Sequence, residues 1–295
     1  MNLAPIALFI YNRPLHTEKT IESLAKNIQA NQSELIIFAD GPRNNQNKVE
    51  VESINLTRML ARNAKGFKSV KIFESSTNLG LKTNVISGIN KIFEKFEKVI
   101  VVEDDLITSK YFLTYCNECL EVYSNSCNIF SISAYQHPIK FEKTETFLCP
   151  FINSWGWATW KSKWGIYEPT QNELNTIKNK KWISTRFNLG DFNYDHMFEN
   201  KKSWAILWYY YVFIHNGLNV WPTKSLVYNI GHDGSGENSG IYYNGPTLFN
   251  ESIKIDRKTN LDLDSLSLFY NYFDKKPTPP LHQRIKNKIC NLFKK

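Results

Sequence analysis

The chain has 295 residues, of which 42% are hydrophobic and 14% aromatic; this is enough for a packed core and excludes an intrinsically disordered protein. The formal net charge is +8, but residues 275–295 hold seven Lys or Arg and no acid, which leaves +1 for the rest of the chain. A nucleic-acid-binding protein carries basic residues across a folded face, so this distribution argues against nucleic acid as a partner.

The first ~130 residues alternate between short apolar runs and patterns with helical spacing. These patterns predict strands at 4–11, 34–39, 70–73 and 99–102, and helices at 15–29, 49–64 and 82–95. Strands that alternate with helices indicate an α/β fold with a mostly parallel sheet and flanking helices.

A polar cluster follows each of the four predicted strands. The clusters are Asn12-Arg13, Asp40-Gly41, Asn78 to Gly80, and Glu103 to Asp105. Open parallel sheets bind ligands at the carboxyl ends of their strands, so we expect these four clusters to surround one ligand site.

The acidic cluster is the sharpest of the four. In extended geometry Glu103 and Asp105 share one side of the strand and Asp104 takes the other. Carboxylates this close repel one another unless protons or a cation compensate, and Mg²⁺ or Mn²⁺ prefers such oxygen ligands. The sequence thus predicts a metal site, with a solvated acidic loop as the alternative.

Five segments carry a family resemblance, in this order: FIYNRP (9–14), ADGPR (39–43), NLGLKTN (78–84), VIVVEDD (99–105) and SWGWATW (154–160). Over about residues 4–240 the chain resembles glycosyltransferases of the GT-A type, and among them bacterial sugar transferases related to the N-acetylglucosaminyltransferase I family. The resemblance implies a GT-A-like fold, a nucleotide-sugar donor, Mn²⁺ or Mg²⁺ as cofactor, an inverting transfer and a place in bacterial surface polysaccharide synthesis.

The resemblance also implies roles for single residues. Asp105 would ligate the metal, and Asp104 would contact the ribose or the donor sugar. Glu103 would be among the substrate-binding residues. The other residues implied in donor binding are Tyr11, Asn12 and Arg13 for the nucleotide, Asp40 for the base edge, and Asn78, Gly80 and Lys82 beside the diphosphate and base. Arg13 and Lys82 also have simpler interpretations, as a solvated turn residue and a surface helix residue.

Residues 129–274 form the expected acceptor half, which contains all eight tryptophans. Trp157, Trp160 and Trp164 stand at helical spacing, which favours core filling. Aromatic faces also stack on sugars, and the family resemblance places the Gly-Trp element in the wall near donor and acceptor. We expect Trp155 and Gly156 to take that role.

An inverting transfer needs a general base, and the resemblance implies an acid directly before Ser-Trp-Ala-Ile. This chain has Lys202 there. The remaining candidates are Glu199, then Asp195 and Asp191. Asp195 and Glu199 are four residues apart, so a helix would place them on one face. A solvated acidic face is the alternative.

Two further segments carry predictions. The glycine-rich stretch Asn229 to Gly240 suits a lid over the donor, and His232 within it is a candidate second metal ligand or phosphate contact. The tail at 281–295 places apolar residues on one helical face among Lys and Arg, which predicts either contact with an anionic membrane or a solubilising extension.

The sequence therefore predicts a nucleotide-sugar-binding half at 1–128, an acceptor half with a closing loop at 129–274, and a basic tail at 275–295. The acceptor would be a glycan or a lipid-linked glycan. The absence of a recognisable secretory signal or ~20-residue apolar run predicts a cytoplasmic protein, at most at the inner face of the membrane. A nucleotidyltransferase and a non-catalytic glycan-binding protein on the same fold remain alternatives.

Overall fold

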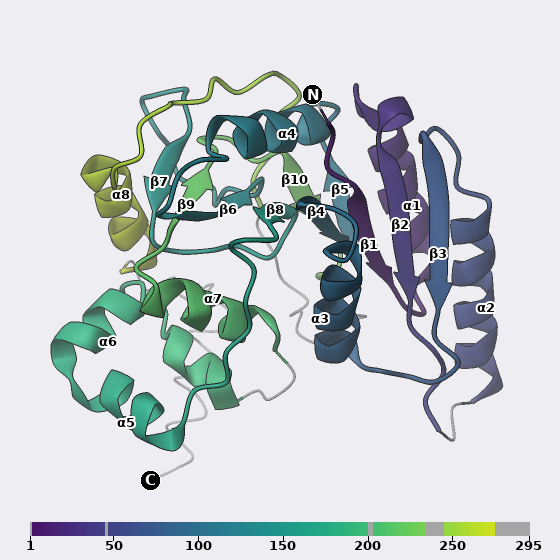
Figure 1. Cartoon of the computed structure of the whole chain (residues 1–295), viewed down its shortest axis with the longest axis horizontal. Helices are drawn as coiled ribbons and strands as arrows, with labels where there is room; N and C mark the ends of the chain where they lie inside the picture. The colour runs from purple at the N-terminus through teal and green to yellow at the C-terminus, as the bar shows by residue number, and fades with distance from the viewer. Residues whose placement is uncertain (1, 45–46, 200–202, 234–244, 275–295) are drawn as a thin grey trace, which may run out of the picture.

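The computed structural model describes residues 2–44, 47–199, 203–233 and 245–274 (Figure 1). Its centre is an eight-stranded sheet in the order β3-β2-β1-β4-β8-β6-β9-β7, and a two-stranded sheet joins β10 to β5. The strands are β1 (Ile6–Ile10), β2 (Glu34–Ala39), β3 (Ser69–Glu74), β4 (Lys98–Glu103), β5 (Leu106–Thr108), β6 (Ile129–Ser133), β7 (Phe147–Cys149), β8 (Trp157–Trp160), β9 (Leu218–Trp221) and β10 (Val227–Asn229).

The sheet has a parallel part and a mixed part. Strands β3, β2, β1 and β4 are parallel neighbours. Strand β8 runs antiparallel to both β4 and β6, β9 is parallel to β6, and β7 closes the edge in the antiparallel sense. The predicted α/β fold, with a mostly parallel sheet flanked by helices, is confirmed.

Helices cover the sheet on both sides (Figure 1). Helix α3 packs on β1, and α4 packs on β4, β6 and β8, whereas α1 lies against α2 and β5. The helices are α1 (Pro14–Ala25), α2 (Lys48–Arg62), α3 (Leu81–Ile92), α4 (Phe112–Val122), α5 (Gln171–Asn179), α6 (Lys181–Phe187), α7 (Ala205–Ile214) and α8 (Leu263–Phe273), with short 3₁₀ turns η1 (Ala30–Gln32) and η2 (Tyr194–Glu199). The four strands and three helices predicted before residue 103 are all present, with ends shifted by up to a few residues.

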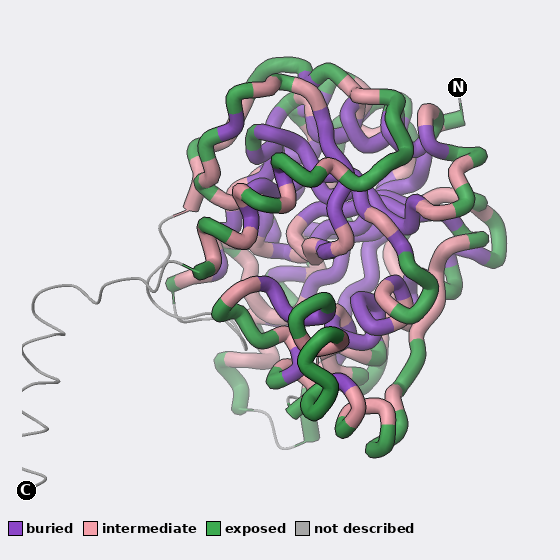
Figure 2. Tube along the Cα trace, turned by 90° about the vertical axis from the view of Figure 1, so that its left-hand side faces the viewer, coloured by how far each residue is buried: buried purple, intermediate pink, exposed green. Residues whose placement is uncertain are grey.

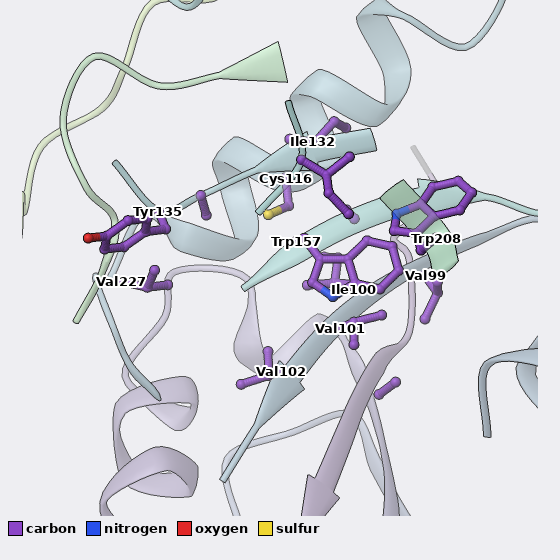
Figure 3. Packing of buried hydrophobic residues seen from close by; sticks show 14 of the residues in the cluster. Val99, Ile100, Val101, Val102, Cys116, Ile132, Tyr135, Trp157, Trp208 and Val227 are labelled. Carbon is purple, nitrogen blue, oxygen red and sulfur yellow. The ribbon is translucent and has the colours of Figure 1, made fainter. Parts of the chain in front are cut away.

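The core is continuous across the sheet, as the buried segments at the centre of Figure 2 show. Strand β4 is its middle: Val99 to Val102 are fully buried, because helices cover both faces of this strand. Figure 3 shows these valines beside Trp157 of β8 and Trp208 of α7. The carboxylates that follow Val102 are thereby carried at the end of a fully buried segment.

The tryptophan-rich segment is a strand, which corrects the helical spacing considered from the sequence. Trp157 and Trp160 of β8 point to opposite faces, as strand geometry requires. The ring of Trp157 stacks on Trp204 with centroids 5.4 Å apart, while Trp160 Nε1 donates a hydrogen bond of 3.1 Å to the Leu120 carbonyl of α4. These side chains fill the core on both sides of the sheet.

The expectation that Asp195 and Glu199 share a helical face is wrong. They lie in η2, and in a 3₁₀ helix residues three apart, not four apart, share a face. Asp195 is buried, whereas the Glu199 side chain is 70% exposed and pairs with Lys178 at 3.5 Å. Lys202, residues 234–240 of the predicted lid and the tail at 275–295 lie outside the described residues.

Candidate active site

A cavity of about 810 Å³ opens at the carboxyl ends of β1, β2 and β4. It brings together all four polar clusters that follow the predicted strands. The predicted residues in its lining are Tyr11, Asn12, Arg13, Asp40, Asn78, Gly80, Glu103, Asp104, Asp105, Trp155 and His232. The location is the one expected for the ligand of an open parallel sheet.

Arg13 and the acidic cluster form the charged centre of the cavity. Arg13 directly precedes α1, where Pro14 starts the helix. Its Nη2 forms an ion pair with Oδ1 of Asp104 and another of 3.0 Å with Oδ2 of Asp105. The Thr20 hydroxyl of α1 donates to the Asp104 carbonyl at 2.8 Å, so helix α1 holds both partners. Arg13 is therefore a fixed counter-charge rather than a solvated turn residue.

The predicted alternation of the three acids is wrong. Strand β4 ends at Glu103, and Asp104 and Asp105 form a turn before β5. A turn breaks the two-residue period of a strand, so both aspartates reach the same guanidinium. One cation thus offsets two of the three carboxylates.

Burial and repulsion from neighbouring carboxylates disfavour the charged forms of Glu103 and Asp104. Burial, then Asp105 and Asp104, raise the pKa of Glu103 to about 8. Burial also raises the pKa of Asp104, against the opposing effect of Arg13. Burial works against the charge of Arg13 itself, but the two aspartates outweigh it and raise its pKa. The cluster is short of positive charge, a condition that a bound cation would relieve.

Asp40 organises the loop beyond β3. Its carboxylate accepts hydrogen bonds from the backbone N–H groups of Gly41 (2.8 Å), Leu79 (2.7 Å) and Gly80 (3.0 Å), and from Asn78 Nδ2 (3.1 Å). These four bonds use about all of the lone-pair positions of a carboxylate. The geometry assigns Asp40 to positioning this loop, and a base-edge contact would have to replace one of the bonds.

The loop that Asp40 fixes starts helix α3. Gly80 caps α3 with φ of +76°, a left-handed conformation that glycine adopts without strain. Asn78 and Gly80 line the cavity, so the predicted diphosphate or base contacts are sterically available. Lys82 lies outside the lining and pairs with Glu168 at 2.5 Å.

The segment after β10 lies against the acidic turn. Asn229 of β10 pairs with Leu106 of β5, and the Ile230 N–H donates to the Asp105 carbonyl at 2.8 Å. A Cβ on Gly231 would collide with Asp105 Oδ2, so any other residue here would force the Asp105 carboxylate to move. This pairing carries His232 to the cavity, 127 residues along the chain from Asp105.

The other end of the cavity is aromatic. Trp155 packs edge-on against Tyr135 and His232, with ring centroids 4.7 and 5.5 Å away. Gly156, with φ of +68°, lies behind this wall against Val227 and Phe112 rather than in the lining. Further wall residues come from segments distant in sequence: His137, Ile152, Phe192, Tyr194, Met197, Trp204, Ile206, Tyr209 and Phe273.

None of the three candidate bases is part of the described lining. Glu199 and Asp191 are exposed, whereas Asp195 is buried and stands in the sequence between the lining residues Tyr194 and Met197. Asp195 Oδ1 accepts no hydrogen bond within the described residues. A buried carboxylate oxygen without a donor is uncommon, and Asp195 is the one buried acid among the three candidates.

The described residues contain no group of three or more His, Cys, Asp or Glu arranged to hold a metal ion. Mg²⁺ seldom needs such a cage, because one or two carboxylates, water and substrate phosphates complete its shell. The side chain of Asp105 is 16% exposed and lines the cavity, so it fits a metal that arrives with a diphosphate.

Several lining residues escaped the sequence analysis. Arg43 lies over the Tyr11 ring at 5.8 Å, and its place in ADGPR was a usable signal. Asn153, Ser154 and Asn229 also line the cavity, next to predicted positions. His137 and Phe273 had no local signal, because only the tertiary fold brings the segment after β6 and helix α8 to this wall.

No family model matches the chain, and no curated protein matches it in sequence. Three solved structures resemble it at low identity. S. aureus TarS aligns with a TM-score of 0.42 and 11% identity, over 78% of this chain and 37% of that one. The structure of S. aureus TarS 1-349 aligns with a TM-score of 0.40 and 13% identity, over 76% of this chain and 60% of that one. The 4-diphosphocytidyl-2C-methyl-D-erythritolsynthase from Anaerococcus prevotii DSM 20548 aligns with a TM-score of 0.33 and 11% identity, over 67% of this chain and 84% of that one. The chain thus spans less than two thirds of the length of each of the two TarS structures.

Proposed function

We propose that this chain is a metal-dependent glycosyltransferase that moves a sugar from a nucleotide-diphosphate-sugar to a glycan or lipid-linked acceptor. One observation carries the proposal. A single cavity joins a charged end, built from the carboxyl ends of parallel strands, to an aromatic end built from the second half of the chain. The five sequence segments that resemble glycosyltransferases supply the charged end and Trp155.

The charged end suits the donor. Arg13 would face the diphosphate, since a guanidinium binds phosphate oxygens through paired N–H groups. Its Nη1 is buried and has no hydrogen-bond partner within the described residues. Tyr11 and Asn12 would contact the nucleotide, and the loop that Asp40 fixes would present Asn78 and Gly80 to the base and phosphates.

The cofactor in this proposal is Mn²⁺ or Mg²⁺, held by Asp105, with His232 as a second candidate ligand. Such an ion supplies Lewis-acid stabilisation of the charge that develops on the leaving diphosphate. Asp104, tied to Arg13, keeps the turn in place and lies beside the donor's ribose or sugar. Glu103 lines the same region of the cavity.

The base in this proposal is Asp195, ahead of Glu199 and Asp191. Asp195 is buried next to the wall, whereas Glu199 is engaged with Lys178 at the surface. Its task is to remove the proton of the acceptor hydroxyl during an inverting displacement, which a positioned carboxylate accelerates by about 10²–10⁴-fold. The aromatic wall would hold the acceptor sugar by stacking.

The first experiment combines binding and turnover. Thermal unfolding is followed with a panel of nucleotide-sugars, with and without Mn²⁺, for the wild type, Asp105→Ala and the exposed control Glu94→Ala. Release of nucleoside diphosphate is measured in parallel. A ligand that binds the folded state raises the melting temperature. We expect a Mn²⁺-dependent rise with one nucleotide-sugar, retained in Glu94→Ala and lost in Asp105→Ala.

Other outcomes separate the alternatives. Pyrophosphate released from a nucleoside triphosphate would indicate a nucleotidyltransferase. Donor binding without turnover, with every acceptor tried, would indicate a binding protein. If no nucleotide-sugar shifts the melting temperature, the proposed donor site is wrong.

A further inference from the structure

One of the eight tryptophans lies on the surface. Five are buried, and Trp155 and Trp164 are partly buried against the core. Trp182 on α6 is 69% exposed and makes no hydrogen bond or ring contact with any residue in the described part of the chain. A single exposed apolar side chain needs no partner by itself, so the charges around Trp182 decide what this surface can bind.

The surroundings of Trp182 are basic. Residues 174–190 contain Lys178, Lys180, Lys181 and Arg186 and no acid, and all four of these side chains are exposed. Lys178 pairs with Glu199 at 3.5 Å, and Arg186 donates a hydrogen bond of 2.5 Å to Asn216 Oδ1. Lys180 and Lys181 form no ion pair with any described residue. Arg186 is four residues from Trp182 in α6, so both side chains lie on the same helical face.

We propose that this basic-aromatic surface, Lys178 to Arg186, docks on an anionic lipid bilayer. Tryptophan is enriched at membrane interfaces, because its ring is apolar and its N–H reaches the headgroups. Lysines beside it add electrostatic attraction to anionic lipids. An acidic protein would match the charge of the lysines, but a lipid interface accounts both for that charge and for the exposed indole of Trp182. No described helix is long and apolar enough to cross a membrane, so the contact would be peripheral.

The surface stands close to the aromatic end of the cavity. Both α5 and α6 contact η2, whose residues Tyr194 and Met197 line that end. Figure 1 shows α5 and α6 together on the side of the molecule away from α1 and α2. Docking through Trp182 would therefore hold the aromatic end of the cavity near the bilayer. The inference does not depend on the proposed glycosyl transfer.

The test is co-sedimentation of the full chain with sucrose-loaded vesicles. One set contains about a third phosphatidylglycerol in phosphatidylcholine, and the other contains phosphatidylcholine alone. The variants are Trp182→Ser and the double reversal Lys180→Glu/Lys181→Glu. The matched controls lie on the opposite side: Val49→Ser on α2, 70% exposed, and Lys19→Glu/Lys26→Glu, in α1 and at its C-cap. Thermal unfolding checks that each variant is folded.

We expect the wild type to bind the anionic vesicles preferentially and to lose binding in 0.5 M salt. The double reversal should weaken binding by about ten-fold or more, since each basic residue at an anionic surface contributes about a five-fold effect. Trp182→Ser should weaken binding several-fold, with both controls within two-fold of the wild type.

Two results would overturn the proposal. The first is a wild type that stays in the supernatant with anionic vesicles; this would leave an acidic macromolecule as the remaining partner for the surface. The second is equal binding by the wild type and both α6 variants, which would place the lipid contact elsewhere on the chain. Nucleotide-sugar binding, measured on the same variants, should be unchanged in either case.

Discussion

Replacing Arg13 by alanine tests the charge balance of the candidate site most directly. Arg13 is the cation that contacts both Asp104 and Asp105, and the Asp104 side chain is only 6% exposed. Removing one partner of a buried ion pair costs about 3–5 kcal/mol, because the remaining charge stays buried without compensation. Asp105 is partly exposed, so we expect Arg13→Ala to lower the free energy of unfolding by about 3 kcal/mol at pH 7.

The pH dependence of this loss has a definite sign. Burial and neighbouring charge already raise the pKa of Asp104 and bring that of Glu103 to about 8. Without Arg13 both pKa values rise further. A carboxyl group with a raised pKa favours folding at low pH and loses that contribution as the pH rises through the folded-state pKa. The penalty should therefore be largest at pH 8 and smaller at pH 5.

Urea denaturation of the wild type, Arg13→Ala and Arg13→Lys at these pH values measures the effect. Lysine keeps the charge but not the paired geometry, so its loss should be intermediate. Millimolar Mn²⁺ should restore part of the stability of Arg13→Ala, since a divalent cation can replace the missing charge. Equal stability of the wild type and Arg13→Ala at pH 7 would refute the assignment of Arg13 as counter-charge. No response to Mn²⁺ would refute the proposed metal site at Asp105.

Three further predictions follow from the same geometry. Asp40→Asn should lower the free energy of unfolding, measured by urea denaturation, by about 2 kcal/mol, because the amide N–H₂ group would face other donors. The exposed Asp191→Asn is the control, and equal losses in both variants would argue against the positioning role of Asp40. Gly231→Ala should weaken nucleotide-sugar binding, measured by calorimetry, more than it lowers the melting temperature, because the new Cβ would displace the Asp105 carboxylate; unchanged affinity would show that the carboxylate does not contribute to binding. Burial lowers the pKa of His137 to about 4, so folding disfavours its protonated form, and the wild type should lose about 2 kcal/mol as the pH falls from about 6.5 to 4. His137→Phe should lack that loss in urea titrations, and an unchanged acid response would place its origin in other groups.

The strand-end clusters could be predicted from the sequence because they depend on local pattern and on a general property of parallel sheets. Each of the four apolar runs before residue 103 forms a strand. Polar residues that follow each of these strands line the same cavity, including Asn78 and Gly80 after the third. The pairing of Arg13 with residues 91 and 92 positions away was not predictable, because tertiary structure alone makes it.

Residue roles were less predictable than positions. Nothing in Asp40-Gly41 shows that four donors from two segments would surround one carboxylate. The spacing of Asp195 and Glu199 suggested an α-helix, but the segment folded as a 3₁₀ turn. The aromatic wall was the hardest part of the site to predict from the sequence, since its residues come from strands, turns and helices spread over more than 130 positions.

The placement of β8 has a practical consequence for dissecting the protein. Strand β8, at residues 157–160, covers the side of β4 that β1 leaves open. Expressing residues 1–128 alone, to isolate the predicted nucleotide-sugar-binding half, would expose the backbone of Lys98 to Val101 as an unprotected sheet edge. Bare apolar edges recruit other chains, so such a fragment should aggregate. A shortened version intended for crystallisation should therefore retain β8, even though its residues follow the predicted boundary by almost thirty positions.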